Sequence, residues 1–476
     1  MAQQRWNFSL HINMKLPSGP QTPTIVQMLQ WVATPMSFME DCAKRYGDIF
    51  SVQLNLPLVL VSNPQALQQI LTSDAKEFSA PSNLNTVFEP LLGKNSVITV
   101  SGETHKRQRQ LLTPPFHGER MHNHAQTISN IAQEVIQSWQ VDKTVCIRSA
   151  MQTITLRVIM QAVFGLYDSN RAQELEKVIS LMMDAGGSSP LRALMLYYPA
   201  LQRDLGKLTP WGTFLRRREM VDNLIYAEIA ERRENPDSKR TDILSLLMAA
   251  RDEMGEPMTD VELRDELLTL LSAGHETTAT ALTWAFYWIH KTPSVHYKLM
   301  AELDGLDNMD FNVINKLPYL SAVCNETLRI YPVGMLTFPR EVKEAINLCG
   351  YDLEPGTYIM GSIYLTHRRE DIYPEPHQFS PERFLEKQFS PYEFLPFGGG
   401  VRKCIGNAFA MLEMKVVLAT IMKQLELELV TTEDVKPRRR GLVTGPNQAI
   451  NMLVKNIRTT NKTDRRLGER SAQPKN

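Results

Sequence analysis

The sequence predicts a mainly α-helical fold with a minor β-sheet region, and three observations support this prediction. Apolar residues recur at helical spacing through most of the 476-residue chain. Runs with strand-like alternation are short and few. No internal repeat or low-complexity linker divides the chain, so we expect one domain over residues 15–460, with a disordered start (1–14) and a mobile charged tail (461–476).

The first elements follow a proline-rich lead-in. Residues 15–20, together with Pro23, favour a stiff extended segment ahead of the domain. Two strand-like runs follow at 49–54 and 58–61, and residues 55–57 supply the turn between them. We therefore expect a hairpin that opens a small sheet.

Helical spacing dominates the rest of the chain. The segment 259–291 exceeds ordinary helix length and is apolar on nearly all sides in its middle, so we expect it to run through the core. Strand patterns return near 345–363 and in a hairpin-like stretch at 440–455. Helices are expected at 124–139, 149–164, 170–184, 211–234, 241–252, 259–291, 294–304, 318–330 and 406–424.

Charge balance, cysteine spacing and the lack of long apolar runs limit the classes to which the protein could belong. Lys+Arg and Asp+Glu both number 52, which gives no support for general nucleic-acid binding. The five cysteines show no spacing typical of disulfide frameworks or zinc fingers, which favours a reducing compartment. Neither a signal peptide nor an apolar run of about 18 residues is evident, so we expect a cytoplasmic protein with no membrane span. We also expect a monomer.

One cysteine lies in an unusual setting. Cys404 follows a glycine-rich turn, 398–400, next to Arg402 and Lys403 and just before a predicted helix. Nearby cations and the free N–H groups of a helix start favour a thiolate, and Phe397 could shield the sulfur from water. The glycines would let the backbone pass close to a large flat group. The alternative is that Cys404 is a small buried hydrophobe, but glycines add little packing and cost backbone entropy.

This run resembles the haem-binding loop of the cytochrome P-450 family, whose pattern is Phe-x-x-Gly-x-Arg-x-Cys-x-Gly. Every fixed position is met, by Phe397, Gly400, Arg402, Cys404 and Gly406. The resemblance implies the cytochrome P-450 fold, with the long helix over haem b (iron protoporphyrin IX). It also implies that the Cys404 thiolate is the axial ligand of the iron, and it is strongest to bacterial, especially cyanobacterial, members.

A second motif lies inside the long predicted helix, where glycine and two threonines are poor helix formers. A threonine hydroxyl that bonds back to a carbonyl one turn earlier can open a helix locally. The resemblance implies that Thr277 stabilises the dioxygen species and that Glu276 relays protons. The alternative is that the Thr277 and Thr278 hydroxyls only satisfy backbone carbonyls while Glu276 pairs with an arginine. We expect His275 to face away from the iron.

Two further sets of residues would support the haem. Glu326 and Arg329 lie three apart on one predicted helix face, and the resemblance implies a buried ionic network with Arg383. Haem propionates need cations or hydrogen-bond donors. The resemblance assigns them to four residues, of which the first two lie four apart on one helix face: His105, Arg109, Arg340 and Arg402.

The resemblance as a whole implies a haem-thiolate monooxygenase that inserts one oxygen atom from O2 into a C–H bond. The apolar residues in the variable regions favour a lipophilic substrate, and the resemblance to bacterial members implies the fatty acid, alkane or terpene class. No dinucleotide fingerprint or flavin module is present, so electrons would come from a separate ferredoxin or flavodoxin-type donor. It would dock on a cationic patch at Lys106, Arg107, Lys403 and Lys415.

Two alternatives to this function remain. One keeps the fold but uses peroxide directly or isomerises an oxygenated substrate, although such relatives usually alter the position of Thr277. The other is a haem-binding sensor without turnover. Candidate pocket residues, each explained equally well by core packing, are Val87, Phe88, Leu91, Leu92, Leu268, Leu271, Val333 to Phe338 and 442–444.

Overall fold

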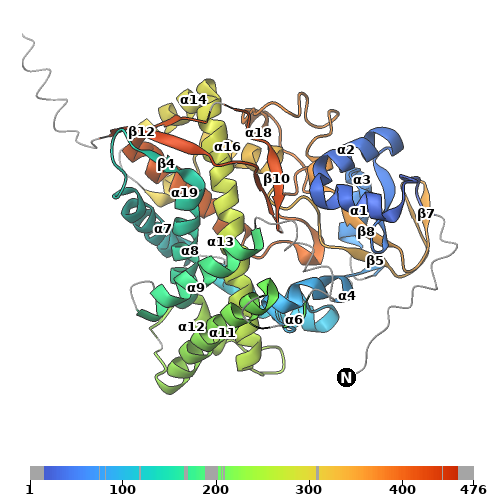
Figure 1. The fold of residues 1–476 in the computed structure, drawn as a ribbon, viewed down its shortest axis with the longest axis horizontal. Coiled ribbons are helices and arrows are strands. Elements are labelled where there is room, and N and C mark those ends of the chain that lie inside the picture. The colour runs from blue at the N-terminus through green and yellow to red at the C-terminus, as the bar shows by residue number, and fades with distance from the viewer. Residues whose placement is uncertain are drawn as a thin grey trace, which may run out of the picture.

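The computed structural model describes residues 16–458, apart from 74–75, 81, 117–119, 166–169, 188–201, 205, 207–208, 238, 307–309, 432 and 442. The predicted disordered start and charged tail lie outside these residues. Helix α13 (Asp260–Lys291) runs through the middle of the molecule, with other long helices on one side of it (Figure 1). The first helices and the largest sheet lie on the other side.

The predicted helices are all present, with ends displaced by at most four residues, as where α7 begins at Arg120 rather than 124. The other longer helices are α1 (Thr24–Ala33), α2 (Pro35–Tyr46), α3 (Pro64–Thr72), α6 (Gly102–Leu112), α7 (Arg120–Ile136), α8 (Ile147–Phe164), α9 (Asn170–Gly187), α11 (Pro210–Glu234), α14 (Pro293–Asp304), α16 (Pro318–Ile330) and α19 (Asn407–Gln424). Shorter ones are α4 (Ser82–Asn85), α5 (Glu89–Leu92), α12 (Ile243–Ala249), α15 (Phe311–Ile314), α17 (Ile363–Thr366) and α18 (Arg383–Glu386).

Four small sheets account for the described strands. The largest has the order β1-β2-β8-β5-β3, and the others are β4-β12-β9, β6-β7 and β10-β11. The strands are β1 (Ile49–Gln53), β2 (Pro57–Val61), β3 (Phe78–Ser79), β4 (Thr144–Cys146), β5 (Arg340–Val342), β6 (Ile346–Leu348), β7 (Tyr351–Leu353), β8 (Tyr358–Gly361), β9 (Leu425–Leu429), β10 (Pro437–Arg440), β11 (Val443–Pro446) and β12 (Asn451–Ile457).

The strand predictions are partly correct. Strands β1 and β2 form the expected antiparallel hairpin, in which Ile49 pairs with Val61. The stretch 440–455 is not one hairpin, because only β10 and β11 pair there, whereas β12 pairs with β4 and β9. Within the described residues no helix is long and apolar enough to cross a membrane.

The central helix begins with a capping box. The Thr259 hydroxyl accepts a hydrogen bond from the Glu262 N–H, and the Glu262 carboxylate accepts one from the Thr259 N–H. Farther along, a Cβ on Gly274 would lie only 2.9 Å from the side chain of Ile159 on α8. Gly274 is therefore required for close packing of α13 on α8, and this contact explains the glycine without a cofactor.

Candidate functional site

The Cys404 loop connects α18 and the residues after it to the start of α19. The Cys404 N–H donates to the Phe397 carbonyl at 3.0 Å, which closes the loop. Cys404 is an exposed residue, although protein atoms surround its sulfur closely enough to desolvate it. This burial raises the pKa of the Cys404 thiol, and the Gly406 N–H, Arg109 and Lys403 only partly oppose it.

The expectation that the loop alone lowers the pKa of Cys404 is therefore wrong, because desolvation outweighs the nearby cations and N–H groups. A metal cation changes this balance, since a coordinating thiol is deprotonated outright. The site therefore offers a metal one donor atom, the Cys404 sulfur, just before the first turn of α19. A single thiolate of this kind fits an iron ion, whose positive charge stabilises the deprotonated sulfur.

Backbone geometry explains the glycines of this loop. Gly398 and Gly400 have φ values of +66° and +64°, in the left-handed region that favours glycine. A Cβ on Gly399 would lie 2.6 Å from the side chain of Leu71 on α3. These requirements are sufficient to account for the three residues. Phe397 is partly buried and packs against the main hydrophobic core.

The predicted propionate residues converge from three elements. His105 on α6 is buried, and its pKa is lowered to about 3 by that burial and by Arg402, Arg109 and Arg340. A neutral imidazole therefore lies among three guanidinium groups. This cluster has the donors and the positive charge that two carboxylates need, so the residues fit the propionates of haem.

Backbone carbonyls hold two of these arginines in place. Arg402 donates to the carbonyls of Val97 at 2.8 Å, Ile98 at 3.2 Å and Val100 at 2.5 Å. Arg340 donates to the carbonyls of Phe338 at 3.1 Å and Pro339 at 3.2 Å. The guanidinium groups are thereby fixed before any ligand binds.

One supporting residue was missed by the sequence predictions. Glu266 on α13 is fully buried, and its carboxyl oxygen accepts from the Val97 N–H at 2.7 Å. Burial raises the pKa of Glu266 well above its ordinary value. The residue ties the 97–100 segment, which holds Arg402, to the central helix. An acidic residue at a position that faces the core of a buried helix is the only sequence signal for it.

The threonine motif lies on an exposed stretch of α13. The Thr277 hydroxyl donates to the Ala273 carbonyl at 2.5 Å, as the sequence predicted. Ala273 is exposed and Thr277 is partly exposed, although the helix is buried on both sides of them. His275 points the other way and lies 3.1 Å from the Thr155 hydroxyl on α8, so it faces away from this stretch as expected.

Glu276 is held by side chains of α8. Its carboxylate accepts from Arg148 at 2.5 Å and from Gln152 at 3.0 Å. The alternative in which Glu276 pairs with an arginine is thus the arrangement in the structure. Arg148 was not among the predicted residues, because no sequence pattern links positions 148 and 276.

The predicted ionic network is present and buried. Glu326 and Arg329 are both 0% exposed, and Arg329 donates to both carboxylate oxygens, at 2.6 and 2.8 Å. Arg383 donates to Glu326 at 3.2 Å, and so does the Ser380 N–H at 2.9 Å. Arg329 also donates to the carbonyl of His367 at 2.9 Å, which locks α16 onto the segment that leads to the Cys404 loop.

The predicted cationic patch is smaller than expected. Lys403 is exposed, and Lys106 is exposed but pairs with Glu103 at 3.7 Å, whereas Arg107 is ion-paired with Asp252 and Glu262. Lys415 is buried and donates to the Asn315 carbonyl at 2.7 Å, so it cannot contribute to a docking surface. Not all of the apolar residues that were candidates for the substrate pocket are available to line it. Leu268 and Leu271 belong to the fully buried core.

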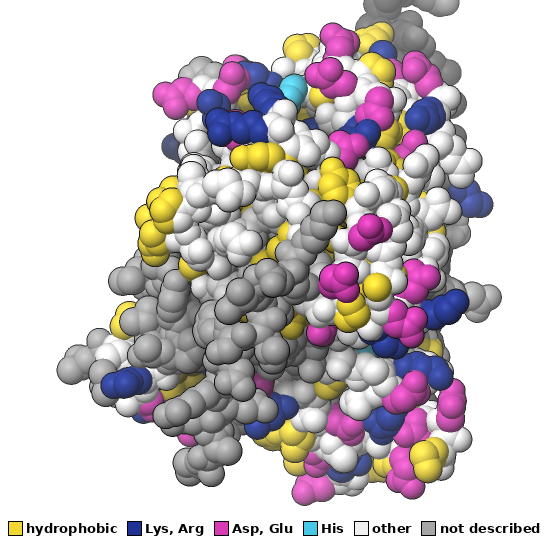
Figure 2. Space-filling view, turned by 90° about the vertical axis from the view of Figure 1, so that its right-hand side faces the viewer, with side chains coloured by type: hydrophobic (Ala, Val, Ile, Leu, Met, Phe, Trp, Pro, Cys, Tyr) yellow, Lys and Arg dark blue, Asp and Glu magenta, His cyan; other side chains and the backbone are white. Residues whose placement is uncertain are grey.

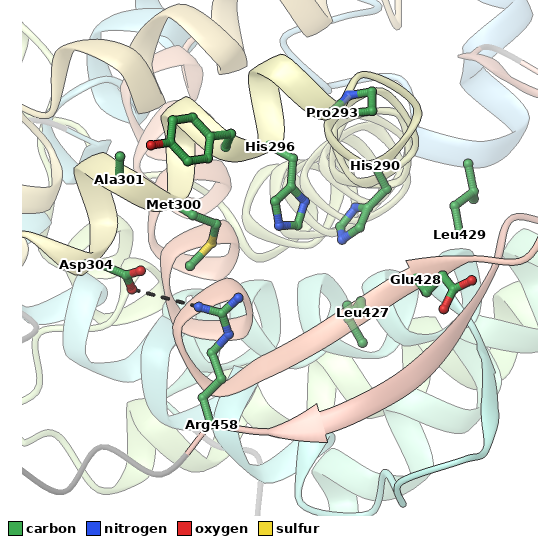
Figure 3. A pocket seen from close by; sticks show the side chains of 11 residues that line it. His290, Pro293, His296, Met300, Ala301, Asp304, Leu427, Glu428, Leu429 and Arg458 are labelled. Carbon is green, nitrogen blue, oxygen red and sulfur yellow. Dashed lines mark ion pairs between the residues drawn. The ribbon is translucent and has the colours of Figure 1, made fainter. Parts of the chain in front are cut away.

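A cleft of about 680 Å³ lies apart from all of these residues (Figure 3). It is formed by α14, the end of α13 and β9, and His290 and His296 face each other in it with ring centroids 5.1 Å apart. None of the predicted site residues lines it, so it is not the site of the chemistry described above.

Comparisons with known proteins agree with the fold. A family model described as "Cytochrome P450" matches residues 17–452. The chain is 35% identical to cytochrome P450 135B1 of Mycobacterium tuberculosis over 465 residues, covering 97% of this chain and 96% of that protein. It is 32% identical to the cytochrome P450 138 of the same species over 442 residues, covering 91% and 95%.

Solved structures show the same likeness. Retinoic acid-bound cyanobacterial CYP120A1 is 25% identical and superposes with a TM-score of 0.80, over 94% of this chain and 100% of the other. The haem domain of cytochrome P450DA, at 21% identity and a TM-score of 0.80, covers 94% and 98% and supports the fold. Members of this family hold iron protoporphyrin IX through a cysteine thiolate, which agrees with the single sulfur and the arginine cluster found here. The chain therefore belongs to the cytochrome P450 family of haem-thiolate monooxygenases.

Proposed function

We propose that this monooxygenase hydroxylates a lipophilic substrate of the fatty acid, alkane or terpene class, with electrons from a separate ferredoxin or flavodoxin-type protein. The observation that supports this proposal most is the Thr277 hydroxyl, held by the Ala273 carbonyl on the exposed stretch of an otherwise buried helix. A hydroxyl at this position is what the reductive activation of O2 requires of the family, and peroxide-using relatives usually alter it.

Each site residue has a defined task in this proposal. Cys404 would hold the iron, and the bound haem supplies the oxidising chemistry. His105, Arg109, Arg340 and Arg402 would hold the propionates. Substrate binding and proton delivery would fall to other residues.

Proton delivery is assigned to Glu276 and Thr277. The Thr277 hydroxyl donates its one hydrogen to the Ala273 carbonyl, so it would have to turn from that carbonyl in order to pass a proton on. Glu276 would relay a proton to the hydroxyl from solvent, and Arg148 holds its carboxylate in place at 2.5 Å. A carboxylate fixed by a guanidinium must turn away from it in order to act, so Arg148 would set the rate of this step.

The lipophilic substrate class rests on two observations. Cyanobacterial CYP120A1 is described with retinoic acid bound, which is a lipophilic carboxylic acid. In this chain, Phe88 and Phe338 approach each other edge to face with ring centroids 6.5 Å apart, and both rings are partly exposed. We propose them as an apolar wall of the substrate pocket.

The separate electron donor rests on sequence and on charge. The sequence has no dinucleotide fingerprint that would bind its own reductant. Lys106 and Lys403 are exposed cations near the Cys404 loop and the propionate helix, where an acidic donor could dock. We also propose that the enzyme works as a monomer in the cytoplasm.

The experiment is reconstitution of the haem-loaded enzyme with ferredoxin, ferredoxin reductase and NADPH. A panel of fatty acids, alkanes and terpenes is first screened by spectral titration, and binding substrates are then tested for oxygenated products. The proposal predicts a hydroxylated product from at least one of them. Consumption of NADPH without any oxygenated product would instead favour a haem-binding sensor, and product formation with peroxide alone would favour a peroxide-using enzyme.

A further inference from the structure

Two histidine side chains meet at the junction of α13 and α14. His290 belongs to the last turn of α13 and His296 to the first turn of α14, and both line the cleft of about 680 Å³. Figure 3 shows the two rings side by side, pointing into the cleft from these helices. Their centroids are 5.1 Å apart and their planes are inclined by 76°. Two imidazoles, the side chains that most commonly bind metals, therefore lie next to one another.

The backbone fixes the tautomer of His290. Its Nδ1 lies 2.8 Å from the Phe286 carbonyl, and a carbonyl can only accept, so Nδ1 carries the proton. Burial lowers the pKa of His290 to about 4, so the ring is neutral at pH 7 and its Nε2 has a lone pair. One ring nitrogen that donates to a backbone carbonyl, while the other offers a lone pair, is the arrangement of metal-binding histidines.

The lone pair of His290 Nε2 has nothing to bind in the described part of the chain. The atom is buried, yet none of the described residues gives it a hydrogen bond. Most buried polar atoms of folded proteins have a partner, and one without a partner indicates a missing water or ion. The site is lined by a second imidazole rather than by a donor chain that is already engaged, because the partly buried side chain of His296 makes no hydrogen bond to a described residue.

The separation of the two rings suits one shared metal ion. A zinc ion lies about 2.0 to 2.1 Å from an imidazole nitrogen, and hence about 3.2 Å from the centroid of the ring. Two such rings at a tetrahedral angle would have centroids about 5.2 Å apart, close to the 5.1 Å in the structure. At the right angle of square-planar copper the centroids would be only about 4.5 Å apart. The distance therefore favours zinc.

The other charged groups of the cleft nearly balance. Arg458 lies 3.9 Å from the carboxylate of Asp304, and Glu428 pairs with Lys455 at 3.1 Å. The surroundings therefore neither attract nor repel a cation strongly, and the two imidazoles would determine the affinity. Among the described residues no third histidine, cysteine, aspartate or glutamate joins the pair in a metal-binding group, so water would complete the coordination of the ion.

We propose that His290, through Nε2, and His296 bind a Zn²⁺ ion in this cleft. Zinc takes neutral imidazole as a ligand, whereas Mg²⁺ and Ca²⁺ require oxygen ligands, which the pair does not offer. The ion would join the last turn of α13 to the first turn of α14 and would give the buried lone pair its partner. The site is separate from Cys404 and from the arginine cluster, so it does not depend on the proposed substrate or electron donor.

The test is equilibrium dialysis of the full-length haem-loaded protein against Zn²⁺, with the bound zinc measured by atomic emission. We expect His290→Gln and His296→Gln each to hold about one zinc ion per chain fewer than the wild type. The first variant keeps an N–H donor for the Phe286 carbonyl. The matched control is His377→Gln, which replaces an exposed histidine and should bind as much zinc as the wild type.

Background binding by other side chains is limited. The chain has 10 histidines in all, and hardly any histidine is visible on the described part of the face in Figure 2, where acidic and basic side chains are interspersed. Thermal unfolding gives a second measurement. Zinc should raise the melting temperature of the wild type and of the control, but not that of the two variants, because a ligand of the folded state stabilises it.

Equal zinc content in the wild type and both variants would overturn the proposal, and so would an equal loss in the control. The two rings would then only be in contact with each other. Diffraction at the zinc absorption edge from a wild-type crystal soaked in Zn²⁺ needs no variant to fold. It should give an anomalous peak between the two rings, and the lack of that peak would also overturn the proposal.

Discussion

The buried carboxylate of Glu326 gives the sharpest test of how the site is supported. Glu326→Gln keeps the size of the side chain but removes the charge that balances Arg329, which is 0% exposed. It also weakens the acceptor of the bonds from Arg383 and the Ser380 N–H. Because Arg329 also donates to three backbone carbonyls, it cannot turn toward solvent without breaking those bonds.

Removing one partner of a buried ion pair costs about 3 to 5 kcal/mol. With a slope of about 3 kcal/mol per molar urea, this corresponds to a midpoint that is lower by about 1 to 1.7 M. The loss is a large part of the total stability of about 5 to 15 kcal/mol that is typical of folded proteins. We therefore expect Glu326→Gln to give little haem-loaded protein at growth temperature.

The assay is urea denaturation of the purified haem-loaded protein, followed by tryptophan fluorescence and by the Soret band. Glu428→Gln is the matched control, since Glu428 is 59% exposed and pairs with the exposed Lys455 at 3.1 Å. The control should denature at the wild-type midpoint. If Glu326→Gln also denatured there and retained its haem, the network would have no stabilising role and the reasoning would be wrong.

Three other substitutions test separate parts of the site and the fold. Thr277→Ala should keep its haem but divert electrons to peroxide, so that a peroxide assay during NADPH oxidation gives a higher yield than in the wild type; unchanged coupling would contradict the assigned role. Glu276→Gln should lower the rate of product formation by about tenfold or more at constant haem content, whereas a wild-type rate would leave Glu276 only as the partner of Arg148. Burial lowers the pKa of His290 to about 4. Below pH 6.5 the unfolded chain therefore binds a proton that the folded protein does not. The free energy of unfolding falls as the pH drops for this reason. His290→Gln, which keeps a donor for the Phe286 carbonyl, should therefore reduce the loss of stability between pH 7 and pH 5 by about 2 kcal/mol, and an equal pH dependence of the urea midpoint would rule out this account.

The sequence predicted the long helices from residue 124 onward because such helices leave local signals. Apolar spacing marks a helix that buries one face or all faces, as α13 does. The Cys404 loop and the Glu326 network can be recognised in the sequence, because each contains a short pattern that combines several specific residue types. The rise in the pKa of the Cys404 thiol without iron could not be predicted in this way, because it depends on burial in the folded chain.

Other features were missed for identifiable physical reasons. Helix α1 buries a glutamine and exposes isoleucine and leucine, so the apolar pattern indicates the wrong face. Arg148 and Glu266 act through partners more than 120 positions away in sequence, which only the tertiary structure brings together. The glycine of the α13 motif, Gly274, packs against Ile159 of α8, a contact that no local pattern indicates.

The central claim is that the Cys404 sulfur is the ligand of the haem iron. The most direct measurement is the spectrum of the reduced carbon monoxide complex of the wild type and of Cys404→Ser. The wild type should show the red-shifted Soret band of thiolate ligation, and the variant should lose it. A wild-type protein without this band, or a variant that keeps it unchanged, would contradict the claim.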